Sequence, residues 1–298
     1  MSRPFRLVAL TALLLVAAVP SVAHGKAKVG ISENKPQMFN DVRFKDLKIK
    51  DVRVVVGWDV VGSKTKAGKA EQQRLDLWMD GAKRDKARVL IAFDKSKNKT
   101  KTPTTKKLVA ALKKLRKRYP GQIKRVSPWN EGNLNKKPSQ YADWYKGIKK
   151  VCKGCKVVPD VVDKPNLVTW TKSFRRAIGS SKIKIWGLHN YVDVNNSQTK
   201  RTKAFLKATT GEVWLTETGG VVYRSNGQSK FAGKGVDFAG KQTTFLFDKI
   251  VKPNKRIKLV YVYHWNIDQP QKQLTWDSAL IDNLGNIRPA YFVIKQNI

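Results

Sequence analysis

The stretch Asp51-Val52-Arg53-Val54-Val55-Val56-Gly57-Trp58 decides the fold class of this sequence. It is rich in valine and mostly apolar, which is typical of a strand buried on both faces of a parallel sheet. Around it, strand-like and helix-like segments alternate eight times, in units of about 30 residues. The alternation predicts an α/β fold, a (β/α)₈ TIM barrel forming one domain over residues 26–298. A doubly wound open sheet is the alternative, but the glycine-rich phosphate turn expected after its early strands is absent from the sequence.

The other elements are expected from hydrophobic periodicity and from terminal residues. The strands should lie near residues 29–32, 88–93, 123–128, 156–159, 182–188, 212–217 and 258–263. Helices are expected near residues 71–83, 141–152, 167–178, 199–209, 242–251 and 289–296. One more helix should be capped by Thr102, with Pro103 at its first position, because Leu108 opens a run of apolar residues at helical spacing.

The first 25 residues are predicted to be a secretory signal peptide and no part of the fold. Arg3 and Arg6 precede an apolar run from Leu7 to Val19, and small residues follow at cleavage spacing. The run is too short for a bilayer span of roughly 20 residues, although an uncleaved anchor is the alternative. We therefore expect a secreted protein, extracellular or associated with the cell wall, with no transmembrane anchor after cleavage.

The chain is strongly basic. It has 298 residues, with 60 Lys and Arg against 22 Asp and Glu, and a formal net charge of +38. Such a balance favours anionic surfaces, polysaccharides or nucleic acid. The alternative is a solvated, lysine-rich exterior, which we favour because the lysines spread over nearly every expected helix. We expect no specific nucleic-acid partner and a monomer.

The only two cysteines, Cys152 and Cys155, are close in sequence. In an exported protein they could close a short disulfide loop. A redox pair is the alternative, but no thioredoxin-like strand–helix context surrounds them. A metal site would need further Cys or His ligands nearby, so we expect no metal and no cofactor.

The residues at the strand ends indicate the chemistry, because barrel enzymes gather function at the carboxyl ends of their strands. Trp129-Asn130-Glu131-Gly132-Asn133 follows one expected strand, and Glu212-Val213-Trp214-Leu215-Thr216-Glu217 ends another. Two carboxylates so placed, beside aromatic and amide side chains, suit acid/base cleavage of a sugar acetal. A lone glutamate would more often be a cap or a salt-bridge partner.

The parity of side chains along the strands supports this pair. His189 and Tyr191 are two residues apart and should share a side, and Val213, Leu215 and Glu217 should share the inward side of their strand. His264 and Trp265 follow the last strand. A metal hydrolase would need His pairs at ligand spacing, and a Ser-His-Asp hydrolase would need a Gly-x-Ser-x-Gly elbow; the sequence has neither.

At these residues the sequence resembles clan A glycoside hydrolases, which are retaining (β/α)₈ enzymes with catalytic glutamates after strands four and seven. Trp-Asn-Glu-Gly-Asn (129–133) and Thr-Glu-Thr-Gly-Gly (216–220) are most similar to the "glycosyl hydrolase catalytic core" β-glucanases, and secondarily to family 39 and family 5 enzymes.

The resemblance implies a role for each matching residue. Glu131 would be the acid/base, and Glu217 the nucleophile. The substrate-binding residues would be Asn130 at the sugar 2-hydroxyl, Tyr191 orienting the nucleophile with His189 beside it, and Trp265 at the subsite floor. The family's arginine near strand two would be Arg53, which lies at the beginning of its strand. Trp58, Trp129 and Trp265 are expected to line the cleft as sugar platforms.

Three functions are therefore open at this point. The first is a secreted retaining β-glycosidase that acts on a poly- or oligosaccharide. The second is a carbohydrate-binding barrel without turnover. The third is a basic protein that binds cell-wall polymers or other anionic polymers without catalysis, which would leave the residues at the strand ends unexplained.

Overall fold

The computed structural model describes residues 26–98, 101–179, 182–225, 233–270 and 275–298. The expected signal peptide, residues 1–25, lies outside these ranges. Within them, no helix is both long and apolar enough to cross a bilayer.

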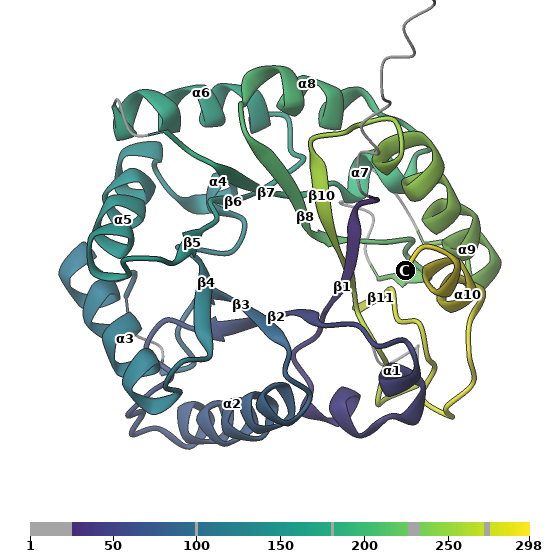
Figure 1. Cartoon of the computed structure of the whole chain (residues 1–298), viewed down its shortest axis with the longest axis horizontal. Coiled ribbons are helices and arrows are strands. Elements are labelled where there is room, and N and C mark those ends of the chain that lie inside the picture. The colour runs from purple at the N-terminus through teal and green to yellow at the C-terminus, as the bar shows by residue number, and fades with distance from the viewer. Residues whose placement is uncertain (1–25, 99–100, 180–181, 226–232, 271–274) are drawn as a thin grey trace, which may run out of the picture.

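The described strands build a closed parallel barrel, which confirms the predicted fold (Figure 1). The sheet order is β5-β4-β3-β2-β1-β10-β8-β7-β6. Its strands are β1 (Lys28–Ser32), β2 (Asp51–Gly57), β3 (Arg88–Asp94), β4 (Ile123–Ser127), β5 (Lys156–Val157), β6 (Asp160–Val162), β7 (Ile185–His189), β8 (Glu212–Thr218) and β10 (Ile257–Tyr263).

The two short strands β5 and β6 share the fifth position of the barrel. β5 pairs with β4, and β6 pairs with β7. Between them, the Val158 amide donates to Val126 O at 2.8 Å, and the Gly187 amide donates to Pro159 O at 2.7 Å. The segment from Lys156 to Val162 therefore closes the ring and gives the eight positions that the sequence predicts.

Helices surround the barrel in Figure 1. They are η1 (Pro36–Asn40), α1 (Val42–Asp46), α2 (Lys66–Arg84), α3 (Thr105–Arg118), α4 (Gly132–Asn135), α5 (Pro138–Val151), α6 (Leu167–Ile178), α7 (Tyr191–Asn195), α8 (Lys200–Ala208), α9 (Val236–Phe245), η2 (Leu246–Val251) and α10 (Pro289–Gln296). A small antiparallel pair, β9 (Tyr223–Arg224) and β11 (Trp276–Asp277), stands apart from the barrel sheet.

Two helix boundaries differ from the expectation. The cap of α3 is Thr104, whose hydroxyl accepts a hydrogen bond from the Lys107 amide at 3.4 Å, and Thr102 instead accepts one from Lys136 Nζ at 3.1 Å. The helix expected from Gln242 begins earlier, at Val236, and passes into a π-helix. Gly235, with φ at 90°, permits that earlier start because glycine adopts positive φ readily.

The residues of β2 divide between two environments, as a strand buried on both faces requires. Val52, Val54 and Val56 belong to the apolar core shared with the helices. Arg53, which alternates with them, is fully buried and contacts side chains from several other barrel strands. The barrel interior therefore holds charged side chains where many TIM barrels hold branched apolar ones.

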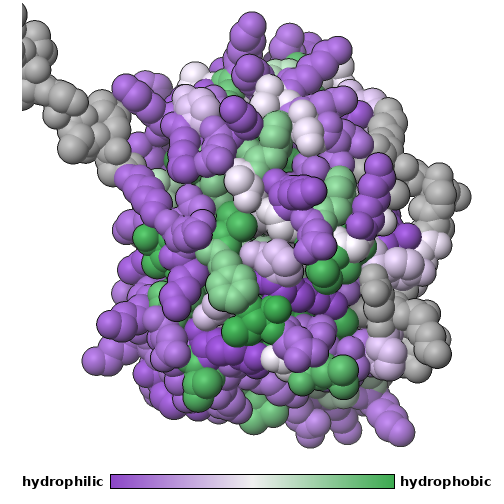
Figure 2. All heavy atoms as spheres, turned by 90° about the vertical axis from the view of Figure 1, so that its right-hand side faces the viewer, coloured by the Kyte–Doolittle hydropathy of each residue, from purple (hydrophilic) through white to green (hydrophobic). Residues whose placement is uncertain are grey.

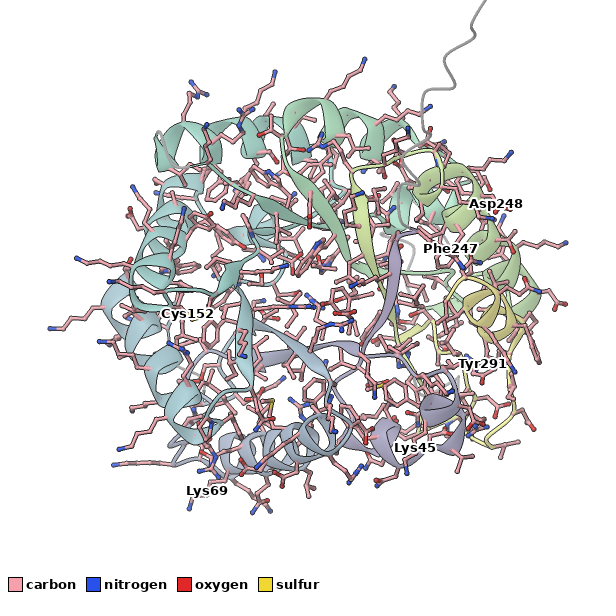
Figure 3. All side chains as sticks on the ribbon, viewed as in Figure 1. Lys45, Lys69, Cys152, Phe247, Asp248 and Tyr291 are labelled. Atoms are coloured by element: carbon pink, nitrogen blue, oxygen red, sulfur yellow. A yellow bond between two sulfur atoms is a disulfide. The ribbon has the colours of Figure 1, made fainter. Side chains whose placement is uncertain are left out.

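The exterior is hydrophilic. Figure 2 shows the face over α9 and α10, where hydrophilic side chains predominate and hydrophobic ones are scattered between them. In Figure 3, long side chains with nitrogen tips project outward around the whole ring, Lys45 and Lys69 among them. The expected spread of lysines over the helices is thus observed in the described residues.

Cys152 and Cys155 are bonded to each other, with their Cα atoms 5.4 Å apart. The disulfide joins the end of α5 to the turn that leads into β5. Of the uses that the sequence left open, the structure shows the local disulfide.

We predict that protein recovered from an oxidising compartment contains this bond, because the fold already brings the two Cα atoms within disulfide distance. Mass spectrometry after alkylation should find no modified cysteine without a reducing agent and two with it. A Cys155→Ser variant, as the control, should be alkylated once in either condition. Two reactive thiols in the unreduced wild type would contradict the prediction.

Candidate active site

Glu131 stands on a sharp turn after β4. Its backbone is left-handed, with φ 49° and ψ 51°, a conformation that costs of order 1–3 kcal/mol outside glycine and is concentrated at functional sites. The next residue must be glycine, because a Cβ on Gly132 would lie 2.2 Å from the Tyr141 ring. The Tyr141 hydroxyl donates to Trp129 O at 2.9 Å and so braces the same turn.

Glu217 reaches the interior through a bulge in β8. On β7, Gly187 and His189 are two residues apart, but they pair with Trp214 and Glu217, which are three apart. Trp214 belongs to a buried cluster with residues of β3, β7 and β10, whereas Val213 and Leu215 pack in the core shared with the helices. The predicted common side for these two and Glu217 is therefore wrong: the extra residue turns Glu217 inward.

Arg53 links the two halves of the site. Its side chain is fully buried, and its Nη1 donates to Glu217 Oε2 at 2.8 Å. Its Nη2 donates to Asp160 Oδ2 at 2.9 Å and to Asn130 Oδ1 at 2.7 Å. Burial alone would lower the pKa of Arg53, but Asp160 and Glu217 raise it above its ordinary value, so the guanidinium keeps its charge.

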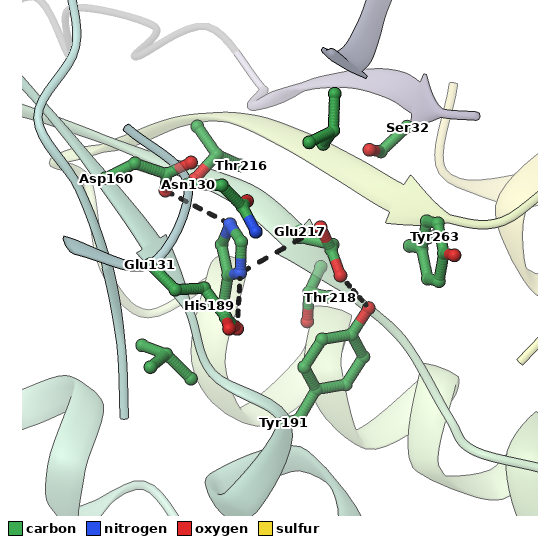
Figure 4. A network of polar contacts seen from close by, with 12 residues as sticks. Ser32, Asn130, Glu131, Asp160, His189, Tyr191, Thr216, Glu217, Thr218 and Tyr263 are labelled. Atoms are coloured by element: carbon green, nitrogen blue, oxygen red, sulfur yellow. Dashed lines mark hydrogen bonds and ion pairs between the residues drawn. The ribbon is translucent and has the colours of Figure 1, made fainter. Parts of the chain in front are cut away.

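His189 lies between three carboxyl groups (Figure 4). Its Nδ1 is 3.0 Å from Glu131 Oε1 and 3.9 Å from Glu217 Oε2, and its Nε2 is 3.1 Å from Asp160 Oδ1. Burial lowers the pKa of His189, but the charges of Asp160 and Glu217 outweigh it and raise the pKa to about 10. These carboxylates favour the imidazolium form of the ring, in which both nitrogens donate, although Arg53 Nη2 also lies 3.3 Å from Nε2.

Asp160 completes this buried charge cluster. Burial would raise its pKa, but His189 and Arg53 lower it to about 2, so it is a carboxylate. Thr216 Oγ1 donates to Asp160 Oδ1 at 2.6 Å. A Cβ on Gly187 would lie 2.8 Å from Thr216 Oγ1 and 2.9 Å from Asp160 Oδ1, which explains glycine at that position of β7.

Glu131 and Glu217 share one neighbour, His189 Nδ1. Their nearer oxygens therefore cannot be farther apart than the sum of two contacts, 3.0 and 3.9 Å. This bound leaves room for the roughly 5–5.5 Å separation of retaining glycosidases.

Tyr191 is the second hydrogen-bond donor to Glu217. Its hydroxyl donates to Glu217 Oε1 at 3.1 Å. Burial raises the pKa of Tyr191 well above its ordinary value, so the phenol keeps its proton.

Both glutamates line a cleft of about 340 Å³ at the carboxyl end of the barrel. Tyr191, Tyr263 and Trp276 supply its aromatic walls. Trp276 belongs to β11, and its ring packs edge-on against Tyr191 with centroids 4.8 Å apart. The small β9–β11 pair thus brings an aromatic side chain to the cleft. Within the described residues, no three His, Cys, Asp or Glu side chains are grouped as metal ligands.

The three expected tryptophan platforms lie elsewhere. Trp265 is only 1% exposed, with its ring edge-on to Phe44. Trp129 is 3% exposed and stacked on Trp144. Neither ring offers a free face, so their expected place on the cleft wall is wrong. Trp58 is half-buried and lines a neighbouring hollow of about 510 Å³ near the ends of β2 and β3.

Sequence reasoning gave no specific role to Asp160, Tyr263 and Trp276, and it named Arg53 only as the family's arginine, without placing its guanidinium at Glu217. Arg53 starts near the amino end of β2, but its long side chain carries the guanidinium up the barrel to Glu217. Tyr263 is two residues before Trp265 and is the last residue of β10. Alternation along the strand from the buried Tyr261 could have indicated Tyr263 as the inward aromatic side chain.

The sequence model of the family described as "Glycosyl hydrolase catalytic core" matches residues 104–293, more than half of the chain. The chain belongs to this family. The matched region contains Glu131, Asp160, His189 and Glu217, and it excludes Arg53. The comparison with curated proteins finds no similar sequence.

Among solved structures, the fold is similar to xylanase B from Clostridium stercorarium F9, with a TM-score of 0.63 and 13% identity over 90% of this chain and 96% of that one. It is also similar to the endo-1,4-beta-xylanase XylE of Penicillium canescens, with a TM-score of 0.63, 14% identity and coverage of 92% and 94%. A third similar structure is a family 39 glycoside hydrolase from Bacteroides cellulosilyticus WH2. Its TM-score is 0.58 at 13% identity, over 95% of this chain and 66% of that one. At these identities the likeness shows a shared barrel fold.

We predict that Asp160 positions His189 and keeps it charged. Asp160→Asn should lower the pKa of His189, measured by NMR titration, and should lower kcat roughly 10–10²-fold, the usual scale for a supporting residue. Thr216→Val is the matched control: it removes one hydrogen bond to Asp160 and keeps the charge, so its effects should be smaller. An unchanged His189 titration in Asp160→Asn would refute this role.

We also predict that Tyr263 contributes to activity and Trp265 to stability. Tyr263→Ala should reduce kcat/KM on a chromogenic β-glycoside while the melting temperature stays near that of the wild type. Trp265→Ala should cost about 3–5 kcal/mol of unfolding free energy, because it empties a packed site. A stable Trp265→Ala protein with a selectively raised KM would make Trp265 a substrate platform after all.

Proposed function

We propose that this protein is a secreted retaining β-glycosidase that cleaves O-glycosidic bonds of a poly- or oligosaccharide. The observation that carries the proposal is the placement of Glu131 and Glu217 around one His189 nitrogen, in a cleft at the carboxyl end of a (β/α)₈ barrel. Membership of a glycosyl hydrolase family supports the reaction type. The disulfide and the predicted signal peptide support export.

The charges around the cleft favour one assignment of roles. Arg53 carries a positive charge that its carboxylate neighbours stabilise. Among the hydrogen bonds of the described residues, Glu131 is bonded to His189 and not to Arg53. Glu217 has the direct guanidinium contact, at 2.8 Å, which suits a carboxylate. Glu217 is therefore the nucleophile and Glu131 the proton donor.

The reaction then has two steps. Glu131 protonates the leaving oxygen while Glu217 attacks the anomeric carbon, which forms a covalent glycosyl ester and releases the leaving group as an alcohol. Glu131, now a carboxylate, takes a proton from water, whose oxygen attacks the same carbon and frees Glu217. Since His189 Nδ1 donates to Glu131 Oε1, the proton that Glu131 transfers belongs on Oε2.

The neighbouring side chains hold the reacting groups in place. Arg53 and Tyr191 each donate to a different oxygen of Glu217, so the carboxylate is fixed at both ends. Arg53 also donates to Asn130 Oδ1, which leaves the Asn130 amide nitrogen as the donor for a sugar hydroxyl. Pre-positioning of this kind lowers the barrier without contact to the leaving group.

The two glutamates should respond differently to substitution. Glu217→Ala should abolish turnover of every substrate. Glu131→Ala should cost roughly 10²–10⁴-fold in rate on a substrate with a poor leaving group, the usual worth of a general acid, and less on an activated aryl glycoside. Azide should rescue Glu131→Ala with a β-azido product and Glu217→Ala with an α-azido product, both identified by NMR.

Glu212→Gln is the matched control, since Glu212 occupies the opposite end of the same strand. It should keep wild-type activity. Exchanged azide stereochemistry would reverse the assignment of roles, and full activity in Glu217→Ala would refute the proposed mechanism.

A further inference from the structure

The amino-terminal end of the barrel, opposite the end that carries Glu131 and Glu217, has a basic hollow of about 480 Å³. It lies where α2 ends and where β3, β4 and β5 begin. We call its cationic residues the amino-end basin. They are Lys83, Lys86, Arg88, Lys124, Arg125 and Lys156. Among the described residues, no Asp or Glu lines this hollow.

The two arginines of the basin are already paired. Arg125 Nη1 donates to Asp51 Oδ1 at 2.5 Å, and Arg88 Nε donates to the same oxygen at 2.9 Å. Asp51 is buried at 1% exposure. The four lysines have no acidic partner in the described part of the chain, and each is exposed. Their charge is therefore available to a ligand.

Two more hollows at the same end are also lined by basic side chains and by no acidic ones among the described residues. One, of about 540 Å³, is lined by Lys172, Arg175, Arg176 and Lys182. The other, of about 220 Å³, is lined by Lys26, Lys252, Lys255 and Lys258, of which Lys252 is paired with Asp248 at 2.6 Å. Neither includes an acidic residue among the described ones that line it, whereas the catalytic cleft does. Exposed lysines also occur on helices all around the barrel, so charge alone does not distinguish this end. Its three hollows differ from the two described at the other end because those two have an Asp or Glu in their lining.

The side chain of Gln122 in this hollow has an oxygen that lacks a hydrogen-bond donor within the described ranges. Its Oε1 is buried in the wall of the basin and has no hydrogen-bond partner among the described residues. A buried carbonyl oxygen without a donor is costly, and such groups are usually satisfied. This oxygen is closed to solvent in the structure, so a sugar hydroxyl reaches it once the half-buried side chain turns toward the hollow, whereas the backbone of DNA has no hydroxyl donor.

We propose that the amino-end basin binds an anionic polysaccharide, one with sulfate, phosphate or carboxylate groups on a hydroxyl-rich chain. The lysines would contact the anionic groups, and Gln122 a hydroxyl. Several basic hollows at one end suit a polymer, which can contact more than one of them. Binding there would hold the protein on a polymer while the cleft at the other end stays accessible, a function separate from the proposed hydrolysis.

The test compares two variants that lose the same charge. The basin variant carries Lys83→Gln, Lys86→Gln, Lys124→Gln and Lys156→Gln. The control variant carries Lys69→Gln, Lys106→Gln, Lys113→Gln and Lys203→Gln, which are exposed positions of α2, α3 and α8 away from the hollow. Binding of fluorescent dextran sulfate is measured across a salt series, with neutral dextran and duplex DNA as comparison ligands.

The basin variant should lose about tenfold or more in affinity for dextran sulfate and show a shallower salt dependence, because fewer counterions are released. The control variant should lose little. Gln122→Leu should weaken dextran sulfate binding and leave DNA binding unchanged. Melting temperature and hydrolysis of a small chromogenic glycoside should match the wild type in all variants.

Three results would overturn the proposal. Equal losses in the basin and control variants would mean that only diffuse charge acts. DNA binding that is tighter than dextran sulfate binding and equally sensitive to the basin lysines would make the site one for nucleic acid. Wild-type protein that binds dextran sulfate no better than neutral dextran would show that the basin takes no anionic polysaccharide.

Discussion

The buried guanidinium of Arg53 is the interaction on which the site depends. A charge with no access to water is very costly unless it is paired and hydrogen-bonded, and removing one partner of a buried pair typically costs about 3–5 kcal/mol. Arg53 meets this requirement with Asp160 of β6 and Glu217 of β8, both across the barrel from β2, and with Asn130 and Ser32. Four other positions of the barrel are thereby tied to one side chain.

The same constraint connects stability to chemistry. Because Arg53 needs Glu217 as a partner, the proposed nucleophile is part of the structural core and its orientation is fixed before substrate arrives. Asp160 connects Arg53 to His189, and His189 in turn contacts Glu131. The low pKa of Asp160 keeps it a carboxylate in this network. Both terminal nitrogens of Arg53 are hydrogen-bonded, whereas its Nε has no partner among the described residues. The bonds of the terminal nitrogens hold the reacting carboxylate of Glu217 in place, which is what catalysis by positioning requires.

The sequence predicted the barrel and its two strand-end glutamates, because buried parallel strands and their carboxyl ends leave local patterns. It did not predict contacts made by long side chains, or features that depend on how neighbouring strands pair. Arg53 acts far from its own Cα, and the bulge that turns Glu217 inward depends on pairing between strands. Tyr263 and Trp265 have similar local patterns, and only packing against Phe44 separates the buried ring from the one in the cleft.

The central claim is that Glu217, held by Arg53, becomes covalently bound to the sugar. It is tested most directly by incubating the protein with a panel of 2-deoxy-2-fluoro-β-glycosides carrying activated leaving groups, which trap the glycosyl ester, and by mapping the labelled peptide with mass spectrometry. We predict one sugar attached to Glu217. A sugar attached to Glu131, or to any other residue, would contradict the account.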